Sequence, residues 1–268
     1  MSIGEIILRG ISRSHAAGDC TQPAAHEVPG QELSLLRREF PQFSGLVKGK
    51  RVVDFGCGWG RQSVALVKEE ACFVCGIDTD QKALSAARKH ASENGLTDGQ
   101  IMFVERPTAE MLKTWDLVIS QDAMEHYPDP PAILNEMKGL LRPGGKILIT
   151  FGPPWYAPYG SHMTFFCKVP WLNLIFSEKT VMSVRARYRN DGATRYEEVE
   201  SGLNKMSVGK FERIVSQSGL VVEYKNYRCI KHQDWLAQVP VLRELFINQV
   251  SCVLSFPPAP GSRAHSSF

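Results

Sequence analysis

Residues 51–60, RVVDFGCGWG, decide the fold class of this chain. A short β-branched run is followed at once by glycines at positions 56, 58 and 60. Glycines placed directly after a strand let backbone amides approach a ligand at the carboxyl edge of a sheet. A nicotinamide fingerprint would need its third glycine at position 61, where Arg61 stands, and normally has an apolar residue in place of Asp54. The carboxylate of Asp54 instead suits a ligand that carries positive charge.

The glycine loop belongs to a series of short apolar runs that alternate with helical segments. The runs are RVVDFG, CFVCGID, IMFVE, WDLVIS and GKILITF, and the helices are expected near residues 62–70, 81–94 and 130–140. Asp80 can cap the second helix, and Asp129 can cap the third. Such alternation is typical of a parallel sheet with helices on its faces, so the sequence predicts an α/β fold.

Further motifs follow in order along the chain. GIDTD (76–80) ends the second run about twenty residues beyond the loop, where Asp78 can accept hydrogen bonds from ribose hydroxyls. WDLVISQDAMEHYPDP (115–130) contains the fourth run, and LLRPGGKILIT (140–150) contains the fifth. Together with VVDFGCGWG (52–60), these segments resemble the class I S-adenosylmethionine-dependent methyltransferases, especially the branch of ubiquinone and menaquinone biosynthesis enzymes. The resemblance covers residues 51–151.

The resemblance implies a fold, a cofactor and a set of contacts. The fold is a Rossmann-like three-layer sandwich with a mostly parallel seven-stranded sheet and a C-terminal antiparallel strand. S-adenosyl-L-methionine is the implied cofactor, with S-adenosyl-L-homocysteine as product. Many relatives have Gly-Asp-Ala-Glu after the third strand, with its Asp on the adenine amino group, whereas this chain has Thr108 at that position. The implied cofactor-binding residues are Asp54, Gly56, Cys57 and Gly58 in the loop, Asp78 and Thr79 at the ribose, Thr108 and Ala109 at the adenine, and Gln121 at the methionine amino group.

The segments outside this core have different patterns of apolar residues. Residues 32–40 have helical spacing of apolar side chains, and the alternation stops after Phe151 for about fifty residues. It resumes with a helix near 208–218 and a strand near 220–230. We expect an N-terminal helical cap over the cofactor site (1–50), the cofactor-binding core (51–151), a lid insertion (152–204), a C-terminal completion of the sheet (205–256) and a disordered tail (257–268).

The insertion is dense in aromatic side chains, eight of which lie between residues 151 and 176. Small-molecule sites are concave and largely apolar, so this density predicts an apolar or aromatic acceptor pocket at Trp155, Tyr156 and Tyr159. A lid that packs on itself would have the same composition. Contact with a membrane surface by the apolar side chains of residues 171–176, flanked by Lys168 and Lys179, is a third alternative.

Two histidines are candidates for a general base. Methyl transfer needs a positioned nucleophile and, for a hydroxyl acceptor, removal of a proton. His126 follows the fourth apolar run beside the expected methyl group, and His162 lies in the insertion. Imidazole titrates in the range that general-base catalysis needs. Each has a structural alternative, since His126 could support the start of a helix and His162 could be a surface-loop residue.

Two other patterns in the insertion point to anions or to nucleic acid. Arg185, Arg187 and Arg189 alternate with uncharged residues, which on an extended strand would place three guanidinium groups on one face. That face could receive an anionic acceptor or lipid heads, or it could be a solvated edge strand.

Gly-Pro-Pro-Trp (152–155) is similar to the motif of amino-group DNA methyltransferases, but it follows the fifth run and begins with a residue that has no side chain to accept from an amino group.

Composition limits the class of partner. The balance of 31 basic against 28 acidic residues is too even for a general nucleic-acid binder. No apolar run is long enough for a transmembrane segment, and the seven cysteines are irregularly spaced, so we expect a cytoplasmic protein with reduced thiols. Cys72 and Cys75, the only CxxC pair, would face opposite sides of a strand, and no metal site is expected.

The sequence therefore predicts a methyltransferase that acts on a small, apolar or aromatic acceptor, with O-methylation favoured. The alternatives are a C- or N-methyltransferase for a lipid-like or anionic metabolite, a cofactor-binding protein of the same fold without turnover, and a nicotinamide-dependent oxidoreductase, which Asp54 and Arg61 disfavour. The expected partner is a small-molecule acceptor, without nucleic acid; peripheral membrane contact stays open, and the sequence does not indicate an oligomeric state.

Overall fold

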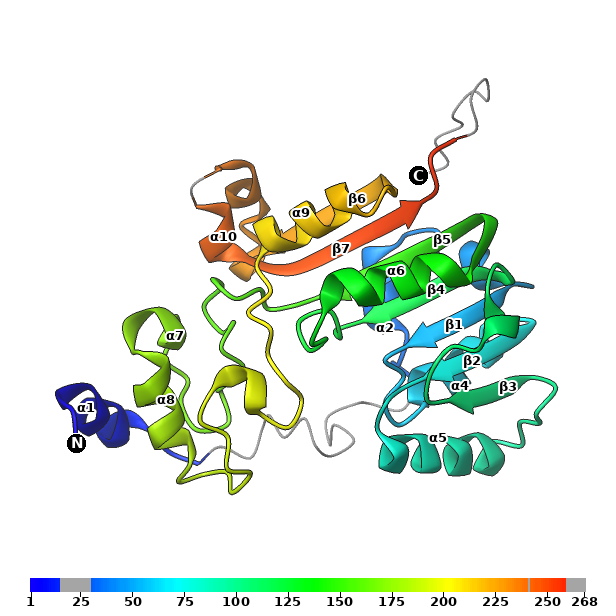
Figure 1. Cartoon of the computed structure of the whole chain (residues 1–268). Helices are drawn as coiled ribbons and strands as arrows, with labels where there is room; N and C mark the ends of the chain where they lie inside the picture. Colours follow the sequence, from blue (N-terminus) through cyan, green and yellow to red (C-terminus); the bar gives the residue numbers. More distant parts are fainter. Residues whose placement is uncertain (15–29, 241, 259–268) are drawn as a thin grey trace.

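A single twisted sheet organises the chain in the computed structural model, which describes residues 1–14, 30–240 and 242–258. The strand order is β3-β2-β1-β4-β5-β7-β6 (Figure 1). Strands β1 to β5 run parallel, whereas β7 is antiparallel to both of its neighbours, β5 and β6. The predicted fold class is confirmed. The strands are β1 (Arg51–Phe55), β2 (Phe73–Ile77), β3 (Ile101–Val104), β4 (Trp115–Gln121), β5 (Leu141–Phe151), β6 (Val221–Cys229) and β7 (Ile247–Ser255).

Helices cover both faces of the sheet. One face packs on α2 (Ser34–Glu39), α3 (Phe43–Val47), α4 (Arg61–Lys68) and α5 (Gln81–Glu93). The other packs on α6 (Pro130–Leu140) and α9 (Val208–Gln217), which lie in front of the sheet in Figure 1. Short helices fill the connections: η1 (Ala109–Met111), η3 (Ile230–His232), η4 (Asp234–Gln238) and α10 (Arg243–Phe246).

The predicted capping residues lie at the starts of the helices that flank the site. The side chain of Asp80 accepts from the backbone amide of Lys82 at 2.8 Å, and that of Asp129 accepts from Ala132 at 3.2 Å. Gly60 has φ +73°, and a Cβ atom there would lie 2.6 Å from the Cβ of Ala87 in α5. Only glycine permits both this backbone conformation and this close approach, so the loop and α5 pack tightly together.

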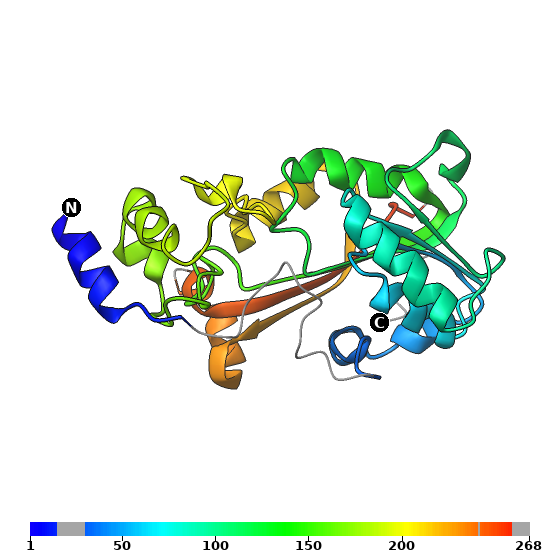
Figure 2. The same cartoon turned by 90° about the horizontal axis from the view of Figure 1, so that it is seen from below.

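The insertion forms a lobe with its own core. The insertion lobe consists of α1 (Ile3–Ile11) and residues 153–203, which contain α7 (Leu172–Ile175), α8 (Glu178–Arg185) and η2 (Tyr196–Glu198). Buried side chains from α1, α8 and the connecting segments pack together, separately from the two sheet cores. Figures 1 and 2 both show α1, α7 and α8 at the end of the molecule away from α5.

The predicted strand of alternating arginines is wrong. Glu178–Arg185 is helix α8, which begins where the Ser177 hydroxyl accepts from the amide of Thr180 at 3.3 Å. Arg185 is buried, and its guanidinium donates to both oxygens of Asp191 at 2.6 and 2.5 Å. Alternation over five residues is a weak strand signal, and the capped helix with its buried apolar face outweighs it.

The N-terminal segment divides between two places. The apolar side chains of the predicted 32–40 helix, Leu33, Leu36 and Phe40, are buried against the sheet core. Helix α1 instead packs on α8 in the insertion lobe. Residues 15–29, and the part of the predicted disordered tail from 259 onward, lie outside the described residues. Within the described residues, no helix has the length and apolar character needed to cross a bilayer.

Candidate active site

The glycine loop lies at the carboxyl ends of β1 and β2. The amides of Gly56 and Cys57 donate to the carbonyl of Ile77 at 2.8 and 3.0 Å. The carboxylate of Asp78 accepts from the amides of Gly58 and Asp80 at 2.8 and 2.9 Å. Gly58 has φ +49°, and a Cβ atom there would meet nothing within 4 Å. The loop therefore presents open backbone beside a fixed carboxylate, as a bound nucleoside requires.

Asp54 is buried, and its carboxylate ties β1 to α4. One oxygen accepts from the side-chain amide of Gln62 at 2.6 Å, and the other accepts from the hydroxyl of Ser63 at 2.5 Å. Burial raises the pKa of Asp54 to about 6, although these two hydrogen bonds oppose the shift. The structure thus shows Asp54 holding the glycine loop in place through α4.

The tip of β4 carries a polar atom that lacks a partner. Within the described residues, Oε1 of Gln121 is buried and accepts no hydrogen bond. A buried acceptor without a donor is costly, and an amino group of a ligand would satisfy it. This atom, the open backbone at Gly58 and the carboxylate of Asp78 fit S-adenosylmethionine, whose amino and ribose hydroxyl groups are donors. Thr79, Thr108 and Ala109 are exposed in the loops that follow β2 and β3.

Tyr127 closes the site on the side of Gly56. Its hydroxyl donates to the carbonyl of Phe55 at 3.0 Å and lies 2.9 Å from the hydroxyl of Ser120. A Cβ atom at Gly56 would come within 3.0 Å of that hydroxyl, so a larger residue there would push against Tyr127. Tyr127 is not among the site residues predicted from the sequence, because a tyrosine after a strand is an ordinary core residue.

The structure brings the two predicted histidines together. The ring centroids of His126 and His162 are 5.6 Å apart, in an edge-to-face arrangement. Nδ1 of His126 lies 2.8 Å from the carbonyl of Gly202, and Nε2 of His162 lies 3.3 Å from the carbonyl of Pro153. Carbonyl oxygens only accept, so each of these nitrogens carries a proton. Burial lowers the pKa of His126, and burial together with the His126 charge lowers the pKa of His162 to about 4.

Both ends of the insertion fasten onto the loop that carries His126. At the start, the amide of Gly152 donates to Oε1 of Glu125 at 3.1 Å. At the end, the side-chain amide of Asn204 donates to the carbonyls of Met124 and Tyr127, each at 2.8 Å, and its backbone amide donates to Glu125 at 2.9 Å. The position of the insertion lobe is therefore linked to that of the histidine loop.

Glu125 is an unusual carboxyl group in this loop. Its side chain is buried, and within the described residues its Oε2 has no hydrogen-bond partner. Burial, with the nearby Asp122, raises the pKa of Glu125 to about 8. The site residues predicted from the sequence do not include Glu125 or Asn204. The contacts of Asn204 join residues nearly eighty positions apart, which no local pattern reveals.

The predicted acceptor residues occupy different surroundings. The Trp155 ring packs edge-to-face on Tyr196 with centroids 4.9 Å apart, and Nζ of Lys205 lies 5.8 Å from both rings. Tyr156 and Tyr159 are exposed. Most aromatic contacts of the insertion lie within the lobe, such as the stack of Phe166 on Tyr188, so packing accounts for much of the aromatic density.

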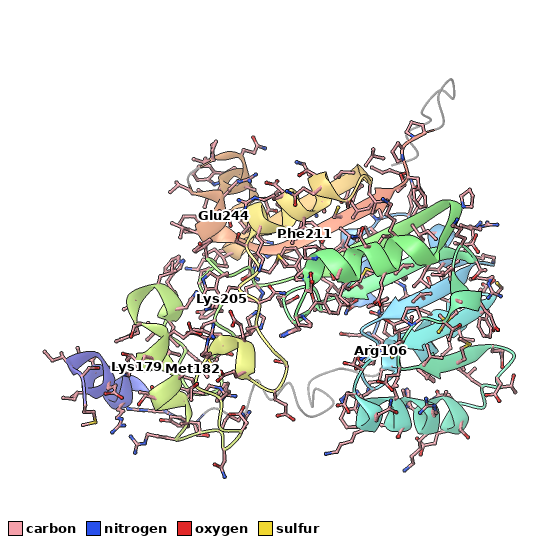
Figure 3. All side chains as sticks on the ribbon, in the orientation of Figure 1. Arg106, Lys179, Met182, Lys205, Phe211 and Glu244 are labelled. Atoms are coloured by element: carbon pink, nitrogen blue, oxygen red, sulfur yellow. The ribbon has the colours of Figure 1, made fainter. Side chains whose placement is uncertain are left out.

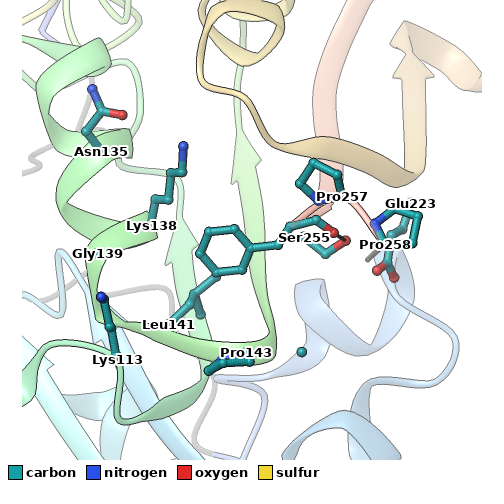
Figure 4. A pocket seen from close by; sticks show the side chains of 12 residues that line it. Lys113, Asn135, Lys138, Gly139, Leu141, Pro143, Glu223, Ser255, Pro257 and Pro258 are labelled. Atoms are coloured by element: carbon teal, nitrogen blue, oxygen red, sulfur yellow. Dashed lines mark hydrogen bonds between the residues drawn. The ribbon is translucent and has the colours of Figure 1, made fainter. Parts of the chain in front are cut away.

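A separate groove of about 820 Å³ lies at the opposite edge of the sheet (Figure 4). It is bounded by the start of β5, the end of β7 and the lysines Lys113 and Lys138. The glycine loop follows the carboxyl end of β1, so this groove is distinct from the candidate active site.

Comparison with known proteins identifies the sheet domain. Residues 46–152 match the family model "Methyltransferase domain". The chain is 37% identical over 108 residues to a ubiquinone biosynthesis O-methyltransferase of Aeromonas salmonicida, covering 40% of this chain and 45% of that protein. It is 33% identical over 130 residues to the enzyme of that name from Bordetella avium, covering 48% and 54%. The chain thus spans about half the length of the curated relatives it matches.

Solved structures share the fold beyond the matched domain. A putative S-adenosylmethionine-dependent methyltransferase from Listeria monocytogenes is similar over 85% of this chain and 98% of its own, with a TM-score of 0.55 and 16% identity. Magnesium protoporphyrin IX methyltransferase from Synechocystis, solved with bound S-adenosylhomocysteine, covers 85% and 82%, with a TM-score of 0.52 and 16% identity. Residues 46–152 therefore match a methyltransferase domain, and the wider chain shares the fold of these solved structures.

Proposed function

We propose that this protein transfers a methyl group from S-adenosylmethionine to a hydroxyl of a small, apolar or aromatic acceptor, with His126 as the general base. The observation that carries the proposal is the buried histidine pair in the loop that follows β4, the strand whose last residue is Gln121 with its unpaired oxygen. The names of the relatives, ubiquinone biosynthesis O-methyltransferases, support a hydroxyl acceptor on a quinone-like ring.

The cofactor contacts follow from the geometry of the loop. Asp78 would accept from the ribose hydroxyls, Gln121 would accept from the methionine amino group, and the backbone of Gly56, Cys57 and Gly58 would line the cofactor. Thr79, Thr108 and Ala109 would border the ribose and adenine from the neighbouring loops. When bound, S-adenosylmethionine supplies an electrophilic methyl group on a sulfonium.

His126 suits the role of base better than His162. Nδ1 of His126 donates to Gly202, which fixes the ring, and Nε2 would take the proton that the acceptor hydroxyl loses. The pKa of about 4 makes His162 a weak base near neutral pH. His162 would orient the His126 ring through the edge-to-face contact, and Trp155, Tyr156 and Tyr159 would border the acceptor.

Cofactor binding is the first test. We expect calorimetric titration to show binding of S-adenosylmethionine and S-adenosylhomocysteine but not of a nicotinamide dinucleotide. Asp78→Ala should weaken the cofactor by at least about ten-fold, because ribose hydrogen bonds to a charged group are worth more than 1 kcal/mol. Asp98→Ala, at a carboxylate in an exposed loop, serves as the matched control. Unchanged affinity in Asp78→Ala would overturn the ribose assignment.

The base is tested by a pH profile on catechol-type acceptors. Because burial lowers the pKa of His126, kcat/KM should rise with pH to a plateau, and the midpoint of the rise should lie below that of an exposed imidazole. His126→Asn should lower kcat by about 10²–10⁴-fold and remove the acid limb, with cofactor affinity unchanged. Turnover at the wild-type rate in His126→Asn would mean that proximity alone drives the reaction, and cofactor binding without turnover of any acceptor would support the binding-protein alternative.

A further inference from the structure

The insertion lobe exposes an apolar surface that the proposed reaction does not use. Of the fourteen large apolar side chains exposed among the described residues, seven lie on α1 and α7 or beside α1. Each exposes between 45% and 78% of its surface. We call this surface the α1–α7 patch, and its residues are Met1, Ile3, Ile6, Ile7, Ile11, Leu174 and Ile175.

Helix α1 turns its apolar face outward. Positions 3, 6, 7, 10 and 11 are Ile, Ile, Ile, Gly and Ile, and they span a contiguous arc of roughly 140° on a helix of 100° per residue. This arc bears no polar side chain. The opposite side faces the lobe, where Leu8 is buried and the carboxylate of Glu5 accepts from the hydroxyl of Ser183. An ordinary surface helix would place its charged side chains outward instead.

Helix α7 lies close to α1 and exposes two further apolar side chains. A Cβ atom at Gly4 of α1 would lie 3.6 Å from Cδ1 of Phe176, the residue that ends α7, and 3.6 Å from Cγ2 of Thr180 in α8. Helices α1 and α7 therefore meet at α8. Figure 3 shows Lys179 and Met182 of α8 directly beside α1. Contiguous apolar patches of this kind mark interaction sites rather than ordinary exposed residues.

Basic side chains flank the patch. Lys179 is exposed next to Thr180, which contacts α1. At the other end of α1, the amide of Arg13 donates to Phe166 at 2.9 Å, which brings exposed Arg13 near exposed Lys168. The nearby acids have partners in the lobe, since the carboxylate of Glu5 accepts from Ser183 and that of Glu178 accepts from Lys205. The rim around the patch is thus positive.

We propose that the α1–α7 patch docks the protein on the surface of an anionic lipid bilayer. A helix with a wide apolar face and flanking basic residues lies in the plane of a membrane interface, with its apolar side chains among the acyl chains and its cations at the headgroups. A second copy of the chain is a poorer occupant, because a two-fold contact would bring the two basic rims together. The proposal does not depend on the reaction that the active site catalyses.

Vesicle co-sedimentation of the purified full-length chain tests this docking. We expect binding to phosphatidylcholine vesicles that contain 30% phosphatidylglycerol, weaker binding to phosphatidylcholine alone, and loss of binding as salt is raised. Ile3→Gln/Ile7→Gln and Leu174→Gln/Ile175→Gln should each weaken partitioning by at least about ten-fold. The matched control is Leu112→Gln/Trp235→Gln, which changes two similarly exposed apolar residues on the sheet domain and should bind like the wild type. Lys168→Gln/Lys179→Gln should reduce only the anionic preference, whereas Lys82→Gln/Lys113→Gln should not.

Three results would overturn the proposal. The first is that neither kind of vesicle binds the protein at low salt. The second is that the patch variants and the control variant lose vesicle binding equally. The third is that light scattering shows a dimer, which Ile3→Gln/Ile7→Gln abolishes, while vesicles bind no protein. The exposed substitutions leave the lobe core intact, and circular dichroism verifies folding. Cofactor titration of the same variants separates this test from the catalytic one, because failure to bind vesicles with normal cofactor affinity would leave the proposed reaction standing.

Discussion

At the residue scale, the candidate site combines a partly exposed carboxylate with buried carboxyl groups whose pKa values are raised. Asp78 is held by two backbone amides and stays available at the sheet edge, whereas Asp54, also in the predicted set, is enclosed by Gln62 and Ser63. The sequence places both acids beside the glycine loop and does not distinguish their roles. The hydrogen bonds that α4 donates to Asp54 form only after the helix has packed, so no local pattern shows them.

Glu125 should make the stability of the fold depend on pH. The carboxyl ionises near pH 4.5 when unfolded and near pH 8 when folded, so between these values the unfolded state holds fewer protons and gains free energy from ionisation. The contribution of Glu125 is therefore complete below pH 4.5 and is lost as pH rises through 8. Glu125→Gln keeps an acceptor for the amide of Gly152, and it should be more stable than the wild type at pH 8.5 by up to about 4 kcal/mol but not at pH 4.5.

Urea unfolding of both proteins across this range measures the effect of Glu125. Histidines also titrate between these pH values, so the quantity to follow is the difference between wild type and variant at each pH. A difference that stays constant from pH 4.5 to 8.5 would show that the buried carboxyl ionises normally in the folded protein.

At the element scale, sequence predicted the sheet domain well and the insertion poorly. Strands β1 to β4 and helices α5, α6 and α9 lie within one or two residues of their expected ranges, because caps such as Asp80 and Asp129 act locally. Strand β5 starts at Leu141 rather than at Gly145, since pairing of Leu141 with Trp115 across a bulge extends it. Helix α8 was mistaken for a strand because its packing partners are α1 and the far end of the insertion, which no local pattern specifies.

Asn204 should couple the insertion to catalysis. Asn204→Ala removes both side-chain hydrogen bonds to the histidine loop and leaves buried carbonyls unpaired, which should cost about 2–4 kcal/mol of stability. Freed from Asn204, the loop should hold His126 less firmly, so kcat should fall by about ten-fold or more while cofactor affinity changes less than two-fold. Kinetics, calorimetry and the NMR titration of His126 measure these effects.

Asn226→Ala provides the matched control for Asn204. Asn226 is also partly buried and donates one side-chain hydrogen bond, to Glu39 at 3.1 Å, but it lies on β6 away from the histidine loop. We expect this variant to lose stability without changing the pKa of His126. Equal effects of the two variants on kcat would indicate that Asn204 acts only through general stability.

At the scale of the whole molecule, the chain has a cofactor-binding sheet domain and a lobe with a separate core, joined where the insertion leaves β5 and returns to α9. The candidate cofactor contacts all come from the sheet domain, whereas His162 and Trp155 come from the insertion lobe. The family model matches residues 46–152, so it ends where the insertion lobe begins. The insertion lobe, where we propose that the acceptor binds, is the segment in which the sequence carries the fewest transferable motifs.

Separate cores predict that damage to the lobe spares cofactor binding. Phe166 is fully buried in the lobe and stacks on Tyr188 with centroids 5.2 Å apart, so Phe166→Ala should cost about 3–5 kcal/mol of local stability. Hydrogen exchange should increase in α1 and α8 but not in β1 to β5, and turnover should fall while affinity for S-adenosylhomocysteine stays within about two-fold. Phe151→Ala, an equally buried change in the sheet core against Phe211, should weaken exchange protection and cofactor binding together. If Phe166→Ala instead unfolds the sheet domain as Phe151→Ala does, the two cores form one cooperative unit, and the lobe supports the cofactor site directly.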